Sequence, residues 1–367
     1  MSIILFLVIL FVLVLVHEFG HFITAKWTKI RVDEFAIGFP PKVFSWKRGE
    51  TQYSLNLLPF GGFVKIFGEN PAETEEEKKA ENGDLSRSFG AQPKWIQSGV
   101  LLAGIFFNAL LAWVLFSTSY MIGLPTSSQS VFAEGLRDTK LVILEVSNGS
   151  PASIAGVEAG DQIVSVSSQS ENIKGLKPEF FRSFVQDHKG DAIDIAYVRN
   201  GETRNVLITP AVVPGAGYAV GVVIDEIGII KLSPTEAIWQ GLKTTGSLSY
   251  LIIGSLADLI GGMFNGKSEI SSLTGPVGIV GMVGEASKFG FAYLLSFTAL
   301  ISVNLAVLNL LPFPALDGGR FLFVIIESIK GSPIKPIVAN TFNLIGFAIL
   351  IILMLVVTYH DIARLFG

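Results

Sequence analysis

The chain has 367 residues, of which half are hydrophobic and 16% are charged, with a formal net charge of −4. Its mean hydropathy of +0.55 lies outside the range of ordinary soluble domains and indicates a membrane protein. The acidic balance argues against nucleic acid as a partner. Because the sequence contains no cysteine, it excludes disulfides and thiolate metal sites.

Residues 1–27 form the first predicted membrane helix. Residues 2–16 carry no charge, and the apolar run is long enough to cross a bilayer. The motif H-E-F-G-H runs from His17 to His21 inside this helix. Residues four apart share a helix face, so both imidazoles can bind one metal ion, with Glu18 beside them as a base. Ionisable side chains inside a membrane helix are costly to bury and usually mark function.

Residues 28–94 are predicted to lie in the cytoplasm, because lysine and arginine flank the cytoplasmic ends of membrane spans and are frequent here. Runs broken by Gly and Pro around residues 35–57 and 59–66 predict short strands and hairpins. Two interpretations follow. The strands form a small cytoplasmic sheet, or they dip into the membrane beside the metal and offer an edge to an extended peptide. The Glu- and Lys-rich residues 70–90 are expected to be a solvated loop.

Residues 95–124 predict a second span, which returns the chain to the outside. Residues 125–215 are charged, punctuated by Gly and rich in short β-type runs, which predicts a soluble extracytoplasmic domain of roughly 90 residues. Within them, residues 146–163 resemble the strand, helix and turn of a bacterial PDZ domain. Pro151 suits the first position of a helix, and Gly160 with Asp161 suits the following turn.

Residues 291–320 predict a third span that ends in the segment N-L-L-P-F-P-A-L-D-G-G-R. Pro and Gly break a helix, and non-helical backbone at membrane depth is tolerated where it lines a protein-buried site. Asp317 in this segment is the candidate third ligand, completing a His, His and carboxylate set with one open position for water. Taken alone, Asp317 could equally be a polar loop cap. Residues 337–358 predict a fourth span, which leaves both termini outside.

Residues 216–290 are predicted to form a connecting strand and an amphipathic helix at the outer membrane surface. Residues 233–264 are apolar enough to suggest a further span. If they crossed, however, Asp317 would lie at the opposite end of the membrane from His17 and His21, and one ion could not bind all three. The sequence therefore predicts four spans.

Together these motifs resemble the site-2 protease family of intramembrane zinc metalloproteases, in the bacterial branch typified by the regulator of sigma-E protease. The resemblance rests on four segments that span nearly the whole chain: His17 to His21, Gly61-Gly62-Phe63-Val64-Lys65, Thr274-Gly275-Pro276-Val277-Gly278-Ile279, and Asn304 to Arg320 with its N-x-x-P-x-P-x-L-D-G-G core. One departure is that the proteobacterial type has two tandem PDZ domains, whereas this chain has room for one.

The expected fold is a polytopic α-helical membrane protein with four transmembrane helices, a membrane-dipping β-hairpin region and one inserted PDZ-like α+β domain. One Zn²⁺ ion bound by His17, His21 and Asp317 would activate a water molecule, with Glu18 as catalytic base. The resemblance implies that Asn309 lines the substrate site, and it favours the hairpin at residues 61–65 as a second part of that site.

The resemblance further implies that the substrate is a single-span membrane protein cut within its transmembrane segment, such as an anti-sigma factor or a signal-peptide remnant. The other expected partner is the lipid bilayer, and nucleic acid is not expected. The implied location is the bacterial inner membrane, with the PDZ-like domain and both termini outside.

Two other classes of function compete with a protease. A membrane scaffold that presents a PDZ module would not need His, Glu and Asp within the membrane. A metal or ion transporter could use intramembrane His and Asp, but it would not need a base next to its ligand or a peptide-binding module.

Overall fold

The computed structural model describes residues 1–69, 85–128, 137–168, 172–174, 177–199, 201–213, 217–264 and 274–366. The chain divides into two compact units, of which the first comprises Met1–Ser117, Ile238–Gly284 and Leu295–Gly367, and the second Thr118–Ala237 and Glu285–Leu294. Most of the charged loop expected at residues 70–90 lies outside the described residues, up to residue 84.

Four helices in the described part of the chain are long and apolar enough to cross a membrane: α1 (Ser2–Trp27), α3 (Lys94–Ile122), α8 (Phe291–Leu310) and α10 (Pro336–Phe366). Many of their large apolar side chains are exposed, as expected of helices whose outer faces contact lipid. The prediction of a polytopic protein with four spans is confirmed. The helix α6 (Pro234–Phe264) is not among the four, and the sequence predicts that it does not cross the membrane.

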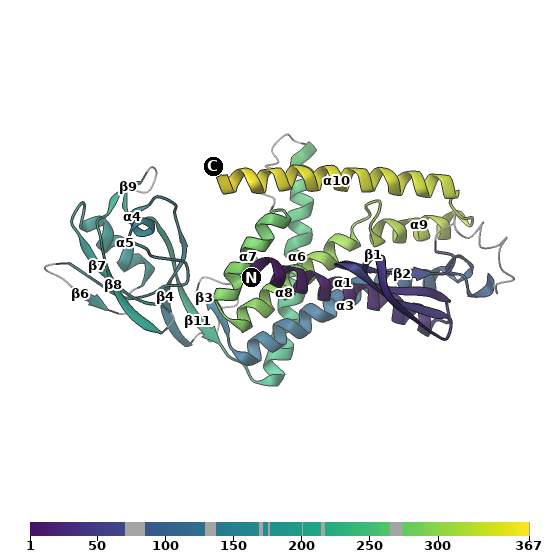
Figure 1. Cartoon of the computed structure of the whole chain (residues 1–367), viewed down its shortest axis with the longest axis horizontal. Coiled ribbons are helices and arrows are strands. Elements are labelled where there is room, and N and C mark those ends of the chain that lie inside the picture. Colours follow the sequence, from purple (N-terminus) through teal and green to yellow (C-terminus); the bar gives the residue numbers. More distant parts are fainter. Residues whose placement is uncertain are drawn as a thin grey trace. The chain divides into compact units, whose positions relative to one another are not determined.

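The strands β1 (Val32–Arg48) and β2 (Thr51–Ile66) fold back on themselves into one small sheet (Figure 1). The first part of β1 pairs on one side with the end of β2, where Phe35 lies opposite Val64, and on the other side with its start, where Phe35 lies opposite Tyr53. The second part of β1 pairs with the start of β2 from Lys42 to Arg48. Residues 62–66 therefore form an edge of the sheet among the described residues.

A buried apolar cluster attaches this sheet to the helices of the first unit. Its members come from the end of α1 and the loop after it, from β1 and β2, from the short helix η2 (Phe89–Ala91), from α3 and from α9 (Asp317–Lys330): Ala25, Ile30, Val32, Ile66, Phe89, Val100, Leu101 and Val324. Removing apolar surface from water stabilises the packing by about 25 cal/mol for each Å² that is buried. The sheet is thus fixed to the helices that carry the H-E-F-G-H and L-D-G-G motifs.

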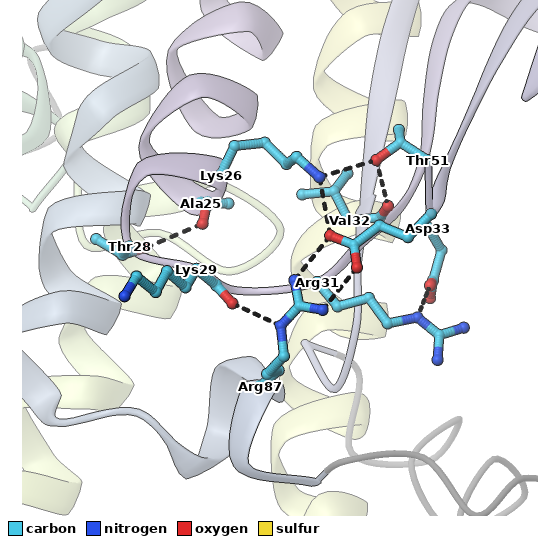
Figure 2. A network of polar contacts seen from close by, with 10 residues as sticks. Ala25, Lys26, Thr28, Lys29, Arg31, Val32, Asp33, Thr51 and Arg87 are labelled. Atoms are coloured by element: carbon cyan, nitrogen blue, oxygen red, sulfur yellow. Dashed lines mark hydrogen bonds and ion pairs between the residues drawn. The ribbon is translucent and has the colours of Figure 1, made fainter. Parts of the chain in front are cut away.

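A polar network holds the turn between β1 and β2 at the end of α1 (Figure 2). The Glu50 carboxylate accepts hydrogen bonds from Lys26 Nζ at 2.8 Å and from two nitrogens of Arg87, at 2.6 and 2.7 Å. Arg87 ends the short helix η1 (Leu85–Arg87), and Thr51 Oγ1 donates to the main-chain oxygen of Val32. Hydrogen bonds from Arg87 first, and then from Lys26, lower the pKa of Glu50 to about 2.

The second unit is built around a sheet of seven strands in the order β3-β11-β4-β5-β7-β8, with β6 paired to β5. These strands are β3 (Leu124–Ser127), β4 (Arg137–Val146), β5 (Gln162–Ser167), β6 (Asn172–Lys174), β7 (Ile193–Arg199), β8 (Glu202–Ile208) and β11 (Val222–Ile230). A separate sheet of two strands is formed by β9 (Ala211–Val213) and β10 (Gly217–Ala219).

The helices α4 (Pro151–Ile154) and α5 (Pro178–Asp187) pack with these strands in an α+β domain. Phe181 and Phe184 of α5 enter the same buried cluster as the strand residues Ile143 and Ile195. Pro151 occupies the first turn of α4, whose N-cap residue Ser150 accepts a hydrogen bond from the main-chain nitrogen of Ser153. An inserted α+β domain is thus present where the sequence predicts one.

The third membrane helix is shorter than the predicted range 291–320. It ends at Leu310, and a separate helix, α9, begins at Asp317. Pro312 and Pro314 explain the break, because proline has no N–H to donate to the preceding turn. The helix α7 (Pro276–Lys288) precedes α8 in the chain.

Candidate metal centre

Three potential ligand atoms lie together in the first unit: Nε2 of His17, Nε2 of His21 and Oδ2 of Asp317. Asp317 Oδ2 lies 2.9 Å from the His17 nitrogen and 3.2 Å from the His21 nitrogen, and the two nitrogens are 3.2 Å apart. A tetrahedral zinc ion with bonds of about 2.0–2.1 Å holds its ligand atoms roughly 3.3 Å apart. The donor set therefore fits zinc, with three protein ligands and one open position.

Glycine at position 20 brings the histidine-bearing face of α1 onto α3. A Cβ atom on Gly20 would lie only 2.6 Å from the main-chain oxygen of Ala103, so a larger residue would push the helices apart. At this crossing His17 and His21 are both buried. Gly20 of the H-E-F-G-H motif is therefore needed for packing, while the two histidines supply the metal ligands.

One face of α3 forms a wall against the two imidazoles, and its members Val100, Gly104 and Asn108 follow one another at intervals of four residues. The Nδ1–H of His21 donates to the main-chain oxygen of Val100 at 2.8 Å. A Cβ on Gly104 would lie 2.7 Å from Cε1 of His21, so only glycine leaves room for the ring. Nδ2 of Asn108 lies 3.1 Å from Nδ1 of His17.

This wall is not among the features predicted from the sequence. A signal was present in the second span, because a single Asn in an apolar helix is costly unless it has a polar partner. Asn108 follows Gly104 by four residues and so shares its helix face, which strengthens that signal.

Glu18, the candidate base, is partly buried and lies within electrostatic range of His17, His21, Asp317 and Glu69. Its neighbour Glu69, just beyond β2, also forms an ion pair with α9. Arg320 donates to Glu69 Oε1 at 2.5 Å and to the Glu69 main-chain oxygen at 3.3 Å. This pair links the end of the sheet to the helix that begins with Asp317.

Two further features fix the position of α9. Cβ atoms on Gly318 and Gly319 would overlap the main-chain oxygens of Leu311 and Phe313, so the L-D-G-G glycines let the first turn pack against the preceding loop. Farther along the helix, Glu327 forms an ion pair of 2.5 Å with Lys94 at the start of α3. Asp317 is thus held at a defined place relative to α1 and α3.

The edge strand starts beside the helix that carries the histidines. Gly61 has a positive φ of 90°, and a Cβ there would lie 3.4 Å from Cγ1 of Val14, which lies three residues before His17. A Cβ on Gly62 would lie 2.6 Å from the main-chain oxygen of Ala36, so this glycine permits close strand pairing.

The remaining residues of the predicted substrate site follow in the strand and in α8. Phe63 stacks on Phe39, with ring centroids 6.4 Å apart, while Val64 and Lys65 pair with residues of β1. Asn309 is partly buried in the last turn of α8. The structure thus brings the three ligand candidates together, with the start of the edge strand next to the helix that carries two of them.

Comparisons with known proteins agree over the length of the chain. The model of peptidase family M50 matches residues 5–353. The chain is 33% identical to the zinc metalloprotease RasP of Geobacillus kaustophilus, covering 100% of this chain and 98% of the relative. It is 38% identical to the putative zinc metalloprotease CPE1693 of Clostridium perfringens, covering 95% of each. It is 31% identical to the regulator of sigma-W protease RasP of Bacillus subtilis, covering 100% and 99%.

A solved structure similar to part of the chain is the PDZ domain of an SdrC-like protein from Listeria innocua, with 21% identity and a TM-score of 0.20. The match covers 23% of this chain and 92% of that one. The family match and the three full-length relatives decide the classification. The chain belongs to peptidase family M50 and is a metalloprotease of the site-2 type.

Proposed function

We propose that this protein is an intramembrane zinc metalloendopeptidase that cuts a single-span membrane protein within its transmembrane segment. His17, His21 and Asp317 would hold one zinc ion. The observation that supports this most is the set of three ligand atoms, 2.9 to 3.2 Å apart, with two of them on a helix apolar enough to cross the membrane.

The residues of the centre divide the chemistry among them. Bound zinc would supply Lewis acidity, which lowers the pKa of a water molecule and polarises the scissile carbonyl. Glu18 would take the proton from the attacking water and pass it to the leaving amine. Its position next to His17 suits it to this role. The burial of both histidines limits the access of bulk water to the site.

The edge of the β1–β2 sheet would hold the substrate. A transmembrane helix hides its carbonyl groups in internal hydrogen bonds, so the substrate must unwind locally before attack. Residues 62–66 form an edge among the described residues, and an extended peptide can add to such an edge through main-chain hydrogen bonds. The approach of Gly61 to Val14 supports a position of this strand beside the metal centre, and Asn309 would contribute from α8.

The name of one relative supports a regulatory substrate. The Bacillus subtilis relative is named for the regulation of sigma-W by proteolysis. We therefore propose a membrane-anchored regulator, such as an anti-sigma factor, as the substrate.

Cleavage of a peptide substrate by the purified protein in lipid vesicles tests the function. Glu18→Gln should reduce turnover by about 10²–10⁴-fold while zinc stays bound, because the base is lost and the ligands remain. Asp317→Ala should lose zinc as well as activity. Near-native turnover of Glu18→Gln would refute the role of the base. Zinc transport into the vesicles that survives Glu18→Gln would support a transporter instead.

Topology is tested separately. We propose a location in the bacterial inner membrane, with the PDZ-like domain and both termini outside, on the strength of the basic residues between α1 and α3. Since the chain has no cysteine, a single introduced cysteine gives an unambiguous label. Cysteine at the exposed Glu202 should react with an impermeant maleimide added to intact protoplasts, and cysteine at the exposed Lys47 should not. The reverse pattern would overturn the orientation.

A further inference from the structure

Asn108 is a fully buried polar side chain in the membrane helix α3, and its environment is unusual. Its Nδ2 lies 3.1 Å from Nδ1 of His17, while its Oδ1 has no hydrogen-bond partner among the described residues. An unpaired buried polar atom costs about 1–3 kcal/mol, which an apolar side chain at this position would avoid. The retention of a carboxamide here therefore points to a role that involves His17.

A histidine can bind a metal ion through Nε2 only when its proton sits on Nδ1, and that Nδ1–H then needs an acceptor. For His21 the acceptor is the main-chain oxygen of Val100, which can only accept. For His17, Nδ1 faces the side chain of Asn108. A carboxamide offers a donor or an acceptor, and a half-turn about its terminal bond exchanges the two.

We infer that Asn108 is a positioning residue of the metal centre, which accepts the Nδ1 proton of His17 through Oδ1 and so presents Nε2 to the metal. In this orientation Oδ1 gains a hydrogen-bond partner, and Nδ2 takes the position that has no partner among the described residues. The backbone at Asn108 is fixed independently, because its main-chain oxygen accepts a hydrogen bond of 2.8 Å from Ser302 Oγ. The inference rests on the proposed zinc site.

An alternative is that Asn108 only joins two membrane helices. The hydrogen bonds argue against it, because the contact with α8 uses the main-chain oxygen of Asn108, which any residue would provide. The side chain itself contacts His17.

Zinc affinity, measured by competition with a chelator on the purified full-length protein, tests the inference through three variants. Asn108→Leu removes the acceptor at similar volume and should weaken zinc binding about 10–100-fold. Asn108→Asp keeps an acceptor and cannot donate, so it should bind zinc at least as tightly as the wild type. Ser302→Ala is the matched control, because it removes a buried hydrogen bond at the same residue without touching the imidazole. Its zinc affinity should be unchanged.

Two results would overturn the inference: wild-type zinc affinity in Asn108→Leu, or equal weakening in the Leu and Asp variants, which would mean a structural role. If Asn108→Leu fails to fold, the Asp variant alone tests the inference, and weaker zinc binding in that variant would overturn it. Failure of the proposed zinc site has a different signature, because the wild-type protein itself would then bind no zinc. Failure of the inference leaves zinc binding by the wild type intact.

Discussion

Replacing Gly104 by alanine adds one methyl group to α3 at the place where both imidazoles lie against it. The new carbon would lie 2.7 Å from Cε1 of His21 and 2.8 Å from Cε1 of His17. Carbon atoms pack at about 3.5–4.0 Å, so the rings or the helix must move by roughly 1 Å. A misplacement of about 1 Å in a catalytic site can cost about 10²-fold in rate. We expect Gly104→Ala to lose turnover by at least this factor and to bind zinc more weakly.

The matched control is Gly99→Ala on the same helix, where a Cβ would meet nothing within 4 Å. Alanine is favoured over glycine inside a helix by about 1 kcal/mol, so this variant should be at least as stable as the wild type and equally active. Turnover in vesicles and bound zinc are measured for both variants. If Gly104→Ala matched Gly99→Ala in both, the imidazoles would not lie against α3 and the geometry of the centre would be wrong.

Three further predictions concern the sheet and its attachment. Val64→Pro should cripple cleavage and Val64→Thr should not, with zinc content unchanged in both, because proline removes an N–H and obstructs strand pairing whereas threonine keeps the β preference. Arg320→Gln should lower turnover about 10-fold with zinc still bound, because the ion pair with Glu69 positions the sheet and α9 for catalysis, and misplacements far from the chemistry reduce rates. In thermal unfolding, the wild type should be more stable than Glu50→Gln, and this difference in stability should be largest above pH 4.5. The difference should disappear as the pH falls towards 2, because the folded-state pKa of Glu50 is lowered to about 2 from 4.5.

Each of these three has a contradicting result. Equal cleavage by the proline and threonine variants, with the fold intact, would make the β1–β2 sheet a cytoplasmic structure without a role in substrate binding. Wild-type turnover of Arg320→Gln would remove the ion pair with Glu69 from the positioning of the site. A stability difference for Glu50→Gln that is the same at pH 6 and pH 3 would mean that the carboxylate is not stabilised by its cationic neighbours.

The sequence by itself determined the features that depend on neighbouring residues. The four spans follow from uncharged apolar runs, because the bilayer selects helices by length and hydrophobicity alone. The shared face of His17 and His21 follows from the helical period, and the helix start at Pro151 follows from its fixed φ and missing N–H. The placement of Asp317 beside the histidines could also be argued, because a membrane leaves only two sides on which a segment can end.

Only the tertiary structure decided which surfaces meet. The wall of Val100, Gly104 and Asn108 has no local pattern of its own, because its role depends on where α1 crosses α3. The two expected hairpins merge into one sheet for the same reason, since strand pairing depends on contacts across the sheet that periodicity does not encode. Close backbone contacts at Gly20, Gly318 and Gly319 allow the segments that carry the ligands to pack together. Close packing between distant segments, rather than local propensity, therefore builds the metal centre.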